Sequence, residues 1–247
     1  MGSKKPITSR KKANFYRNLL VLLILSLLLM FIFLFWYIDV LAVMVFVVVI
    51  IWLIYPYYTI WCRGAAGEES VSKILNDLGN DYLIVNDVLL PGCKGNIDHI
   101  VIGKNGIFII ETKSHKGRII CRGDYWIQQK IGRRGTLYEP YIGSPSKQVK
   151  RNAVALKKFF EKNYPRLSHV WINCIVVFTD KDTVLELKNP SVTVLKIETL
   201  TDYIRNNKSK IAISQSDYSE LEKIFRNLKQ KNRKCFLHHL LSYNLKE

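Results

Sequence analysis

The fold is decided by residues 95–113, which read GNIDHIVIGKNGIFIIETK. Two apolar runs rich in β-branched side chains, Ile97–Ile102 and Ile107–Lys113, flank the sequence Gly-Lys-Asn-Gly. Such runs on either side of a short polar turn are typical of two antiparallel strands joined by a tight hairpin. This segment therefore predicts a hairpin within a sheet.

The register of this hairpin brings three ionisable side chains together. If Lys104-Asn105 forms the turn, Asp98 lies directly opposite Glu111. If Asn105-Gly106 forms the turn, Asp98 faces Lys113 instead. Glu111 is then a diagonal neighbour of Asp98. In both registers the three side chains share one face of the sheet, because residues two apart on a strand point the same way.

The flanking sequence indicates helices and further strands. Ser144-Pro145 is typical of a helix start, with a capping side chain followed by proline at the first helical position. Gly64–Gly67 is predicted to be a short linker. We expect helices over residues 68–78, 145–163 and 200–206 and from residue 216, and strands over residues 82–88, 97–102, 107–113, 171–178 and 192–194, with shorter strands within 118–141. This order predicts an α/β domain in which helices cover a mixed sheet.

The N-terminal segment has the composition of a membrane anchor. Residues 19–38 carry no charge, and a second apolar run covers residues 40–60. Each run is close to the ~20 residues that a helix needs to cross a bilayer. Asp39, between the runs, fits a turn better than the middle of a bilayer. Because six basic residues precede the first run and Arg63 follows the second, we expect a helical hairpin with both ends in the cytoplasm.

The chain is strongly basic, with 37 Lys and Arg against 20 Asp and Glu and a formal net charge of +17. The first 63 residues hold seven of the basic and one of the acidic residues, so the remainder keeps a net charge of +11. Such a charge favours nucleic acid or an anionic membrane surface as partner, although it also serves solubility. The five cysteines are scattered and never spaced as CxxC, which argues against a zinc site or a disulfide framework.

Asp98 and Glu111 form a pair suited to a divalent cation. Two carboxylates this close on buried strands repel each other, and without a cation one of them is forced to hold a proton. Ligands that are all oxygen favour Mg²⁺ or Mn²⁺. Such a metal polarises a phosphoryl oxygen and supplies hydroxide, while Lys113 stabilises the developing negative charge. The alternative is an ion pair at the end of a sheet in which Lys113 only neutralises two acids.

Two helix residues are expected to point toward the same sheet. Glu68 lies on the helix face that carries Val71 and Leu75, and it either joins the site or complements the positive start of its helix. Gln148 falls within the apolar stripe of the later helix. It is either a core amide bonded to the backbone or a residue that contacts the site.

A basic segment with aromatic residues follows the hairpin. Cations with stacking aromatics suit a phosphate backbone and unstacked bases, whereas the alternative is a solvated hairpin with one core tryptophan. The candidate nucleic-acid-binding residues are Arg118, Arg122, Lys130, Arg133, Arg134 and Trp126. Among the histidines, His99 is expected to pack between strands or to support the site, and His115 either reaches the site or lies on a surface loop.

These motifs resemble the nuclease-related (NERD) domain, a family that is similar to the PD-(D/E)XK restriction-endonuclease-like superfamily. The resemblance covers about residues 64–178 and is carried by residues 67–68, 96–99, 106–113 and 145–148. It implies a restriction-endonuclease-like mixed sheet flanked by helices. It also implies a site that consists of Glu68, Asp98, Glu111, Lys113 and Gln148, with Glu68, Asp98 and Glu111 as metal ligands. The family usually has Asn-Pro where this chain has Ser144-Pro145, and serine caps a helix equally well.

The sequence thus predicts a membrane-anchored, Mg²⁺- or Mn²⁺-dependent nuclease that hydrolyses DNA or RNA at the cytoplasmic face. One alternative is a non-catalytic module of the same fold that binds nucleic acid or protein. Another is a membrane scaffold whose acids form a structural ion pair. The predicted divisions are a basic N-terminus at residues 1–18, a transmembrane hairpin in the lipid bilayer at 19–61, the nuclease-like domain at 64–180 and a C-terminal extension at 181–247.

Overall fold

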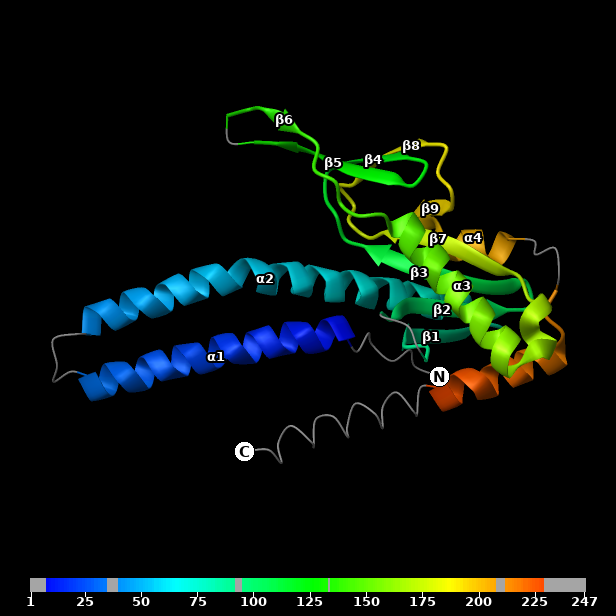
Figure 1. Ribbon diagram of the computed structural model, residues 1–247, viewed down its shortest axis with the longest axis horizontal. Helices are drawn as coiled ribbons and strands as arrows, with labels where there is room; N and C mark the ends of the chain where they lie inside the picture. Colours follow the sequence, from blue (N-terminus) through cyan, green and yellow to red (C-terminus); the bar gives the residue numbers. More distant parts are fainter. Residues whose placement is uncertain (1–7, 35–39, 92–94, 133, 208–211, 229–247) are drawn as a thin grey trace. The chain divides into compact units, whose positions relative to one another are not determined.

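The computed structural model describes residues 8–34, 40–91, 95–132, 134–207 and 212–228 of the 247-residue chain, and its elements are labelled in Figure 1. The chain forms two compact units. One unit comprises Pro6–Ala66, and the other includes Gly67–Glu247.

The N-terminal unit contains two long apolar helices. α1 spans Thr8–Leu34 and α2 spans Val40–Leu75. By length and composition both can cross a membrane, and their apolar windows are 0% and 6% buried, unlike the core helices of a soluble domain. The Lys12 ammonium lies 4.0 Å from the ring centre of Trp61, so the start of α1 lies beside α2 near that residue. This pairing is the one that a helical hairpin requires. The predicted turn around Asp39 lies outside the described residues.

α2 continues without a break through Gly64–Gly67, so the predicted linker is wrong. Glycine costs about 1 kcal/mol relative to alanine inside a helix, which made the linker a natural expectation. Gly67, however, is buried, and a β-carbon there would lie 3.0 Å from Thr179 Oγ1 and 3.3 Å from Ser114 Cβ. The glycine therefore serves a close approach of the helix to the domain. A 3-10 turn, η1, follows at Asn76–Leu78.

The second unit contains two mixed sheets with strand orders β1-β2-β3-β7-β9 and β6-β5-β4-β8. The strands are β1 Leu83–Val88, β2 Ile97–Gly103, β3 Gly106–Lys113, β4 Arg118–Arg122, β5 Tyr125–Ile131, β6 Leu137–Tyr138, β7 Ile172–Phe178, β8 Val184–Lys188 and β9 Thr193–Lys196. The helical elements are α3 Pro145–Asn163, η2 Pro165–His169, η3 Ile197–Thr199, α4 Leu200–Asn206 and a helix over residues 215–228. The predicted mixed α/β fold is confirmed.

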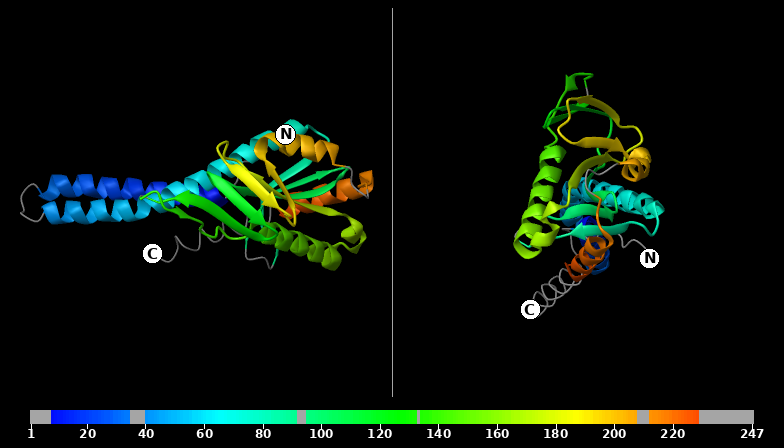
Figure 2. Two further views of the ribbon diagram at one scale, coloured as in Figure 1. Left: turned by 90° about the horizontal axis from the view of Figure 1, so that it is seen from above. Right: turned by 90° about the vertical axis from the view of Figure 1, so that its right-hand side faces the viewer.

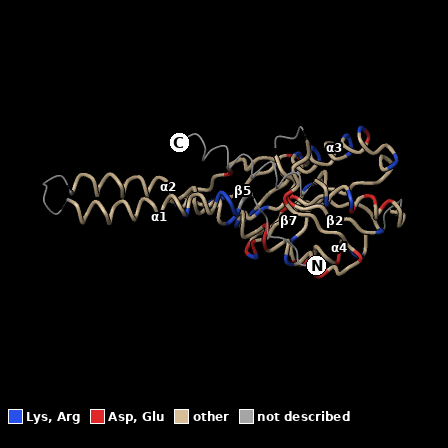
Figure 3. The backbone as a smooth tube through the Cα atoms, turned by 90° about the horizontal axis from the view of Figure 1, so that it is seen from below, with Lys and Arg blue, Asp and Glu red and all other residues tan. Residues whose placement is uncertain are grey.

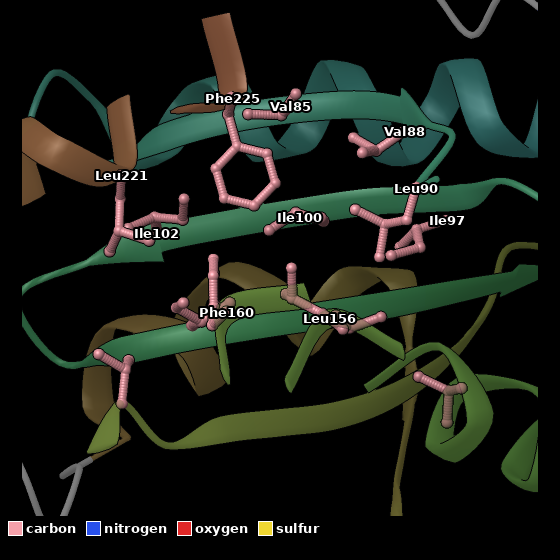
Figure 4. Packing of buried hydrophobic residues seen from close by; sticks show 14 of the residues in the cluster. Val85, Val88, Leu90, Ile97, Ile100, Ile102, Leu156, Phe160, Leu221 and Phe225 are labelled. Carbon is pink, nitrogen blue, oxygen red and sulfur yellow. The ribbon is translucent and has the colours of Figure 1, made fainter. Parts of the chain in front are cut away.

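Helices cover both faces of the five-stranded sheet (Figure 2). Buried residues of α3 and of the 215–228 helix pack on one face, among them Val149, Leu156, Phe160, Leu221 and Phe225. Figure 4 shows Phe225 beside Val85 of β1 and Leu221 beside Ile102 of β2. Val71 and Leu75 of α2 pack on the opposite face, where α4 contributes Leu200 and Ile204. Alternate residues of β2 and β3 therefore face α3 and α2 in turn.

The residues after 180 complete the core. β8 pairs in parallel with β4, and β9 pairs in parallel with β7. The predicted C-terminal extension therefore shares the sheets and the core of the preceding residues. Sequence reasoning missed β8 because this five-residue strand has no fully buried side chain and mixes charged with apolar residues.

One carboxylate fixes the start of α3. Ser144 caps this helix as predicted. Asp124, in the β4–β5 turn, accepts hydrogen bonds from Ser146 Oγ at 2.7 Å and from Lys150 Nζ at 2.7 Å, and also from Ser191 Oγ. These hydrogen bonds, that of Lys150 foremost, hold the pKa of Asp124 well below its usual range. Because Asp124 belongs to the four-stranded sheet, its carboxylate joins that sheet to the first turns of α3.

Candidate active site

The β2–β3 register follows the first of the two sequence alternatives. Ile100 pairs with Ile109 and Gly103 with Gly106, so Lys104-Asn105 forms the turn. Continued to the end of the hairpin, this register puts Asp98 opposite Glu111. Both lie on strand positions that face α3, as does Lys113.

Four of the five predicted site residues are brought together on this face. Lys113 Nζ lies 2.5 Å from Glu111 Oε1 and makes a long hydrogen bond of 3.4 Å to Gln148 Oε1. The backbone N–H of Thr112 donates to Asp98 Oδ2 at 2.8 Å. Gln148 is therefore directed at the site, and of its two sequence interpretations the contact with the site is the correct one.

The two acids share the site with one cation, and their protonation differs. Burial, followed by the charge of Glu111, raises the pKa of Asp98 to about 8. Burial also raises the pKa of Glu111, although Lys113 opposes that shift. Burial alone would lower the pKa of Lys113, but Glu111, Asp98 and Glu68 together raise it. Lys113 is thus charged and pairs with Glu111, and Asp98 has a pKa of about 8, so the acid pair holds a proton near neutral pH.

The donor set of the site fits a hard divalent cation. Glu111 is 1% exposed, and its Oε2 atom is buried without a hydrogen-bond partner. Within the described residues no three His, Cys, Asp or Glu side chains converge as a ready-made metal cluster. Mg²⁺ is commonly held by one or two carboxylates together with water and substrate phosphate, so Asp98 and Glu111 suit it without a full protein cage.

Glu68 lies on α2, whose end packs against the five-stranded sheet. The end of α2 packs on the sheet face opposite to the one that carries Asp98 and Glu111. Its carboxylate nevertheless contributes to raising the pKa values of Glu111 and Lys113. Glu68 therefore lies near the pair without forming a three-residue cluster with it, and its role as a third metal ligand stays a prediction.

Two charged residues near the site were missed by sequence reasoning. The β1–β2 register pairs Asn86 with His99 and Val88 with Ile97, which puts Asp87 across from Asp98. Asp87 adopts a left-handed backbone conformation with φ of 57°, and its charge adds to the raised pKa of Asp98. The sequence did not reveal this neighbour, because no local pattern sets the register between β1 and β2.

The other missed residue is Arg151, one turn after Gln148 on α3. Its charge lowers the pKa of Glu111, which places the guanidinium near the acid pair. The exposed Arg151 side chain borders the site on the α3 side. The signal in the sequence was the i, i+3 spacing from Gln148, which sets two residues on one helix face.

The side of the same strands that faces α2 carries a neutral network of hydrogen-bonded polar side chains. Asn86 Nδ2 donates to Ser72 Oγ at 2.7 Å, and Asn86 Oδ1 lies 2.8 Å from His99 Nδ1. All three residues are buried. Burial lowers the pKa of His99 to about 3, so the imidazole is uncharged, and its Nε2 atom has no hydrogen-bond partner. His99 packs between the sheet and α2, as the sequence predicted.

His115 lies at the exit of the site strand. It is partly buried, and burial, Lys113 and Lys130 together lower its pKa. Lys130 is therefore close enough to His115 for its charge to act on that imidazole. His115 lies in a loop close enough to Lys113 to feel its charge, and a role at the site stays a prediction.

The predicted nucleic-acid-binding residues are not equivalent in the structure. Trp126 is fully buried, stacks on Phe178 with ring centres 5.8 Å apart and donates its indole N–H to Ser146. A role in base stacking is therefore wrong for Trp126, because strand alternation turns it inward. The exposed stacked pair is instead Tyr125 with Tyr141.

The predicted basic residues also differ in their partners. Arg118 forms an ion pair with Glu186 at 2.6 Å, which neutralises much of its charge. Arg122, Lys130 and Arg134 are exposed. Arg133 lies outside the described residues.

A mixed sheet that is flanked by helices and carries an acid pair and a lysine on one face is the arrangement that the resemblance to nuclease-like α/β domains implies. Residues 63–179 match the family model of the nuclease-related domain (NERD), so this part of the chain is similar to that family. The chain is also similar to an uncharacterized Bacillus anthracis protein, with 28% identity over 112 residues. That match covers 43% of this chain and spans 50% of the relative. No solved structure matches the chain significantly.

Proposed function

We propose that this protein is a metal-dependent nuclease that hydrolyses phosphodiester bonds of DNA or RNA. One observation carries the proposal: Asp98, Glu111 and Lys113 gather on one sheet face, and one Glu111 oxygen is buried without a partner. A buried unsatisfied carboxylate oxygen is costly, and a function that uses it accounts for its presence.

Asp98 and Glu111 would hold Mg²⁺ or Mn²⁺ through their carboxylate oxygens. When bound, such a cation polarises a phosphoryl oxygen and lowers the pKa of bound water. The proton on Asp98 has to leave before the carboxylate can serve as a ligand, so the raised pKa of Asp98 sets a pH requirement for metal binding.

The remaining residues act on the phosphate and on the position of Lys113. The Lys113 ammonium, held between Glu111 and Gln148, stabilises negative charge that develops on the phosphate oxygens during the displacement. Gln148 positions Lys113 by accepting a hydrogen bond from its ammonium group. Arg151 borders the acid pair and offers a second cation to the nucleic-acid backbone.

The domain is proposed to work at the cytoplasmic face of a membrane. The two apolar helices support anchoring, and basic residues at both ends of the anchor support cytoplasmic termini. Reporter fusions at residue 2 and at residue 247 test this topology. Reporter activity on opposite sides of the membrane would rule out the hairpin.

Nuclease activity is tested with the whole chain in detergent micelles. Labelled DNA and RNA are incubated with Mg²⁺, Mn²⁺ or EDTA, and cleavage is expected with either metal and not with EDTA. Glu111→Gln should abolish cleavage because it removes a carboxylate ligand. Absence of cleavage under every metal condition would contradict the proposal.

A non-catalytic binding module is the second candidate. It is favoured by the close Lys113–Glu111 ion pair, which neutralises one acid, and by the absence of a three-ligand cluster among the described residues. Such a module would bind nucleic acid without cleaving it. The same assay separates the two candidates, because it follows binding and product formation together.

A further inference from the structure

The β5–β6 hairpin has a surface that the nuclease site does not use. Figure 1 shows this hairpin extending away from the rest of the domain. Ile131 and Leu137 are paired across its strands and are 73% and 61% exposed, so the described residues leave this apolar pair uncovered. Exposed aliphatic pairs at a protruding tip mark a surface that meets another apolar phase.

The tip is short and internally bonded. The Gly132 N–H donates to the Thr136 carbonyl at 2.8 Å, and the Gly135 N–H donates to the Gly132 carbonyl at 3.0 Å. Gly135 has a φ of 74°, which an ordinary side chain rarely adopts. These two hydrogen bonds close the turn beside the exposed Ile131 and Leu137.

The charge around the tip is mainly positive, and Glu139, which accepts a hydrogen bond from Gln129, lies at the base of the hairpin. Residues 125–138 include Lys130, Arg133 and Arg134 and no Asp or Glu. Figure 3 marks the Lys and Arg positions along the backbone in blue and the Asp and Glu positions in red. An exposed stacked tyrosine pair, Tyr125 with Tyr141, lies at the base of the hairpin. Cations next to aliphatic side chains, with tyrosines behind them, complement an anionic bilayer surface.

We propose that the β5–β6 hairpin docks on an anionic phospholipid bilayer, with Ile131 and Leu137 entering the interface and Arg134 contacting phosphate headgroups. Aliphatic side chains gain little from nucleic acid, whereas transfer of their surface into an apolar phase is favourable at about 25 cal/mol per Å². The proposal rests on the membrane anchoring of the proposed function, since the two apolar helices keep a bilayer within reach of this domain.

The test is hydrogen–deuterium exchange of the whole chain in nanodiscs. One set contains phosphatidylcholine alone and the other also contains phosphatidylglycerol. Amide exchange over residues 127–138 should slow in the phosphatidylglycerol discs relative to the neutral discs. Arg134→Glu and the double variant Ile131→Ser with Leu137→Ser should each abolish this difference. Lys181→Glu, an equal charge reversal at an exposed position outside the hairpin, should leave it unchanged.

The outcomes separate the two proposals. If exchange over residues 127–138 is the same in both discs, or slows only when an oligonucleotide is added, hairpin docking on lipid is overturned. A chain that fails to remain with the discs on gel filtration contradicts the anchoring and, with it, the docking. Cleavage assays on the same samples report on the nuclease site alone.

Discussion

Asp98 and His99 are neighbours on β2, yet they belong to two different polar networks on opposite faces of the sheet. The network on the α3 face is charged and unsatisfied, with a raised pKa at Asp98 and an orphaned oxygen on Glu111. The network on the α2 face is neutral, and Asn86 bridges its two partners. Because a buried charge is far more costly than a buried, hydrogen-bonded amide, the first network indicates chemistry and the second indicates packing.

The largest expected effect concerns the charged network. Lys113→Ala should reduce cleavage about 10²–10³-fold, because it removes the cation that stabilises the transition-state charge. Metal binding and much of the affinity for nucleic acid should survive. Single-turnover cleavage of labelled DNA and RNA measures the loss, and Lys104→Ala in the hairpin turn is the matched control. If Lys113→Ala cleaves at the parent rate, the chemistry takes place elsewhere.

The neutral network should matter for stability. Asn86→Ala leaves the buried His99 Nδ1 atom without its partner, and a buried unsatisfied group costs about 1–3 kcal/mol. Guanidinium unfolding of the chain in micelles measures the loss. Asn163→Ala, at the exposed end of α3, should change the unfolding free energy very little. Equal losses of unfolding free energy in the two variants would show that the buried network around Asn86 contributes no more to stability than an exposed side chain does.

Metal affinity should depend on pH through Asp98. The folded protein holds the Asp98 proton up to a pKa of about 8, and a cation has to displace that proton. Affinity for Mn²⁺ should therefore rise roughly tenfold per pH unit below that pKa and then level off. The same raised pKa makes the Asp98 contribution to stability fall as pH rises from about 4 to 8. Calorimetric titrations at several pH values check the affinity, and a flat profile would be the contrary result.

Asp98→Asn sharpens the same comparison. Because this variant cannot be ionised, the unfolding free energy should lose the pH dependence that Asp98 contributes, and metal binding should weaken strongly. His99→Asn should leave the pH dependence of metal binding as it is in the parent, since His99 stays neutral. Denaturation curves and calorimetry at matched pH values separate the two neighbours.

The smallest expected effects lie on the second sheet. Lys130→Glu should weaken nucleic-acid binding at low salt more than Arg118→Glu, because Arg118 already has Glu186 as a partner. Loss of one phosphate contact should also lower the slope of log affinity against log salt by about 1. Fluorescence anisotropy at several salt concentrations measures both quantities. A larger effect from Arg118→Glu would indicate that nucleic acid binds the opposite face of this sheet.

The sequence was sufficient wherever the interaction is local. The β2–β3 hairpin, the α3 cap at Ser144 and the shared face of Glu111 and Lys113 follow from strand and helix periodicity. The neighbour Asp87 depends on the β1–β2 register, which no local pattern sets. Alternation along β5 could have predicted that Trp126 points inward. Its partner Phe178 could not be predicted in this way, because it belongs to the parallel strand β7, which is far away in sequence.

The continuity of α2 illustrates the reverse error. Four small residues were taken as a linker because glycine disfavours helix, yet Gly67 is determined by the space beside Thr179 and Ser114. A tertiary contact outweighed the local propensity.

The connectivity of the site has a consequence for the order in which it forms. Asp98 and Glu111 meet through a hairpin with a two-residue turn, whereas α3 and β7 have to return from residues 145–178 to cover them. Local contacts form earlier in folding than distant ones, because closing a short loop costs less entropy. The two acids therefore come together while water still solvates both, and their repulsion grows only when α3 and β7 exclude that water. The energetic penalty of the site thus falls on the final docking step, so a partly folded chain carries a hydrated acid pair in place of a finished site.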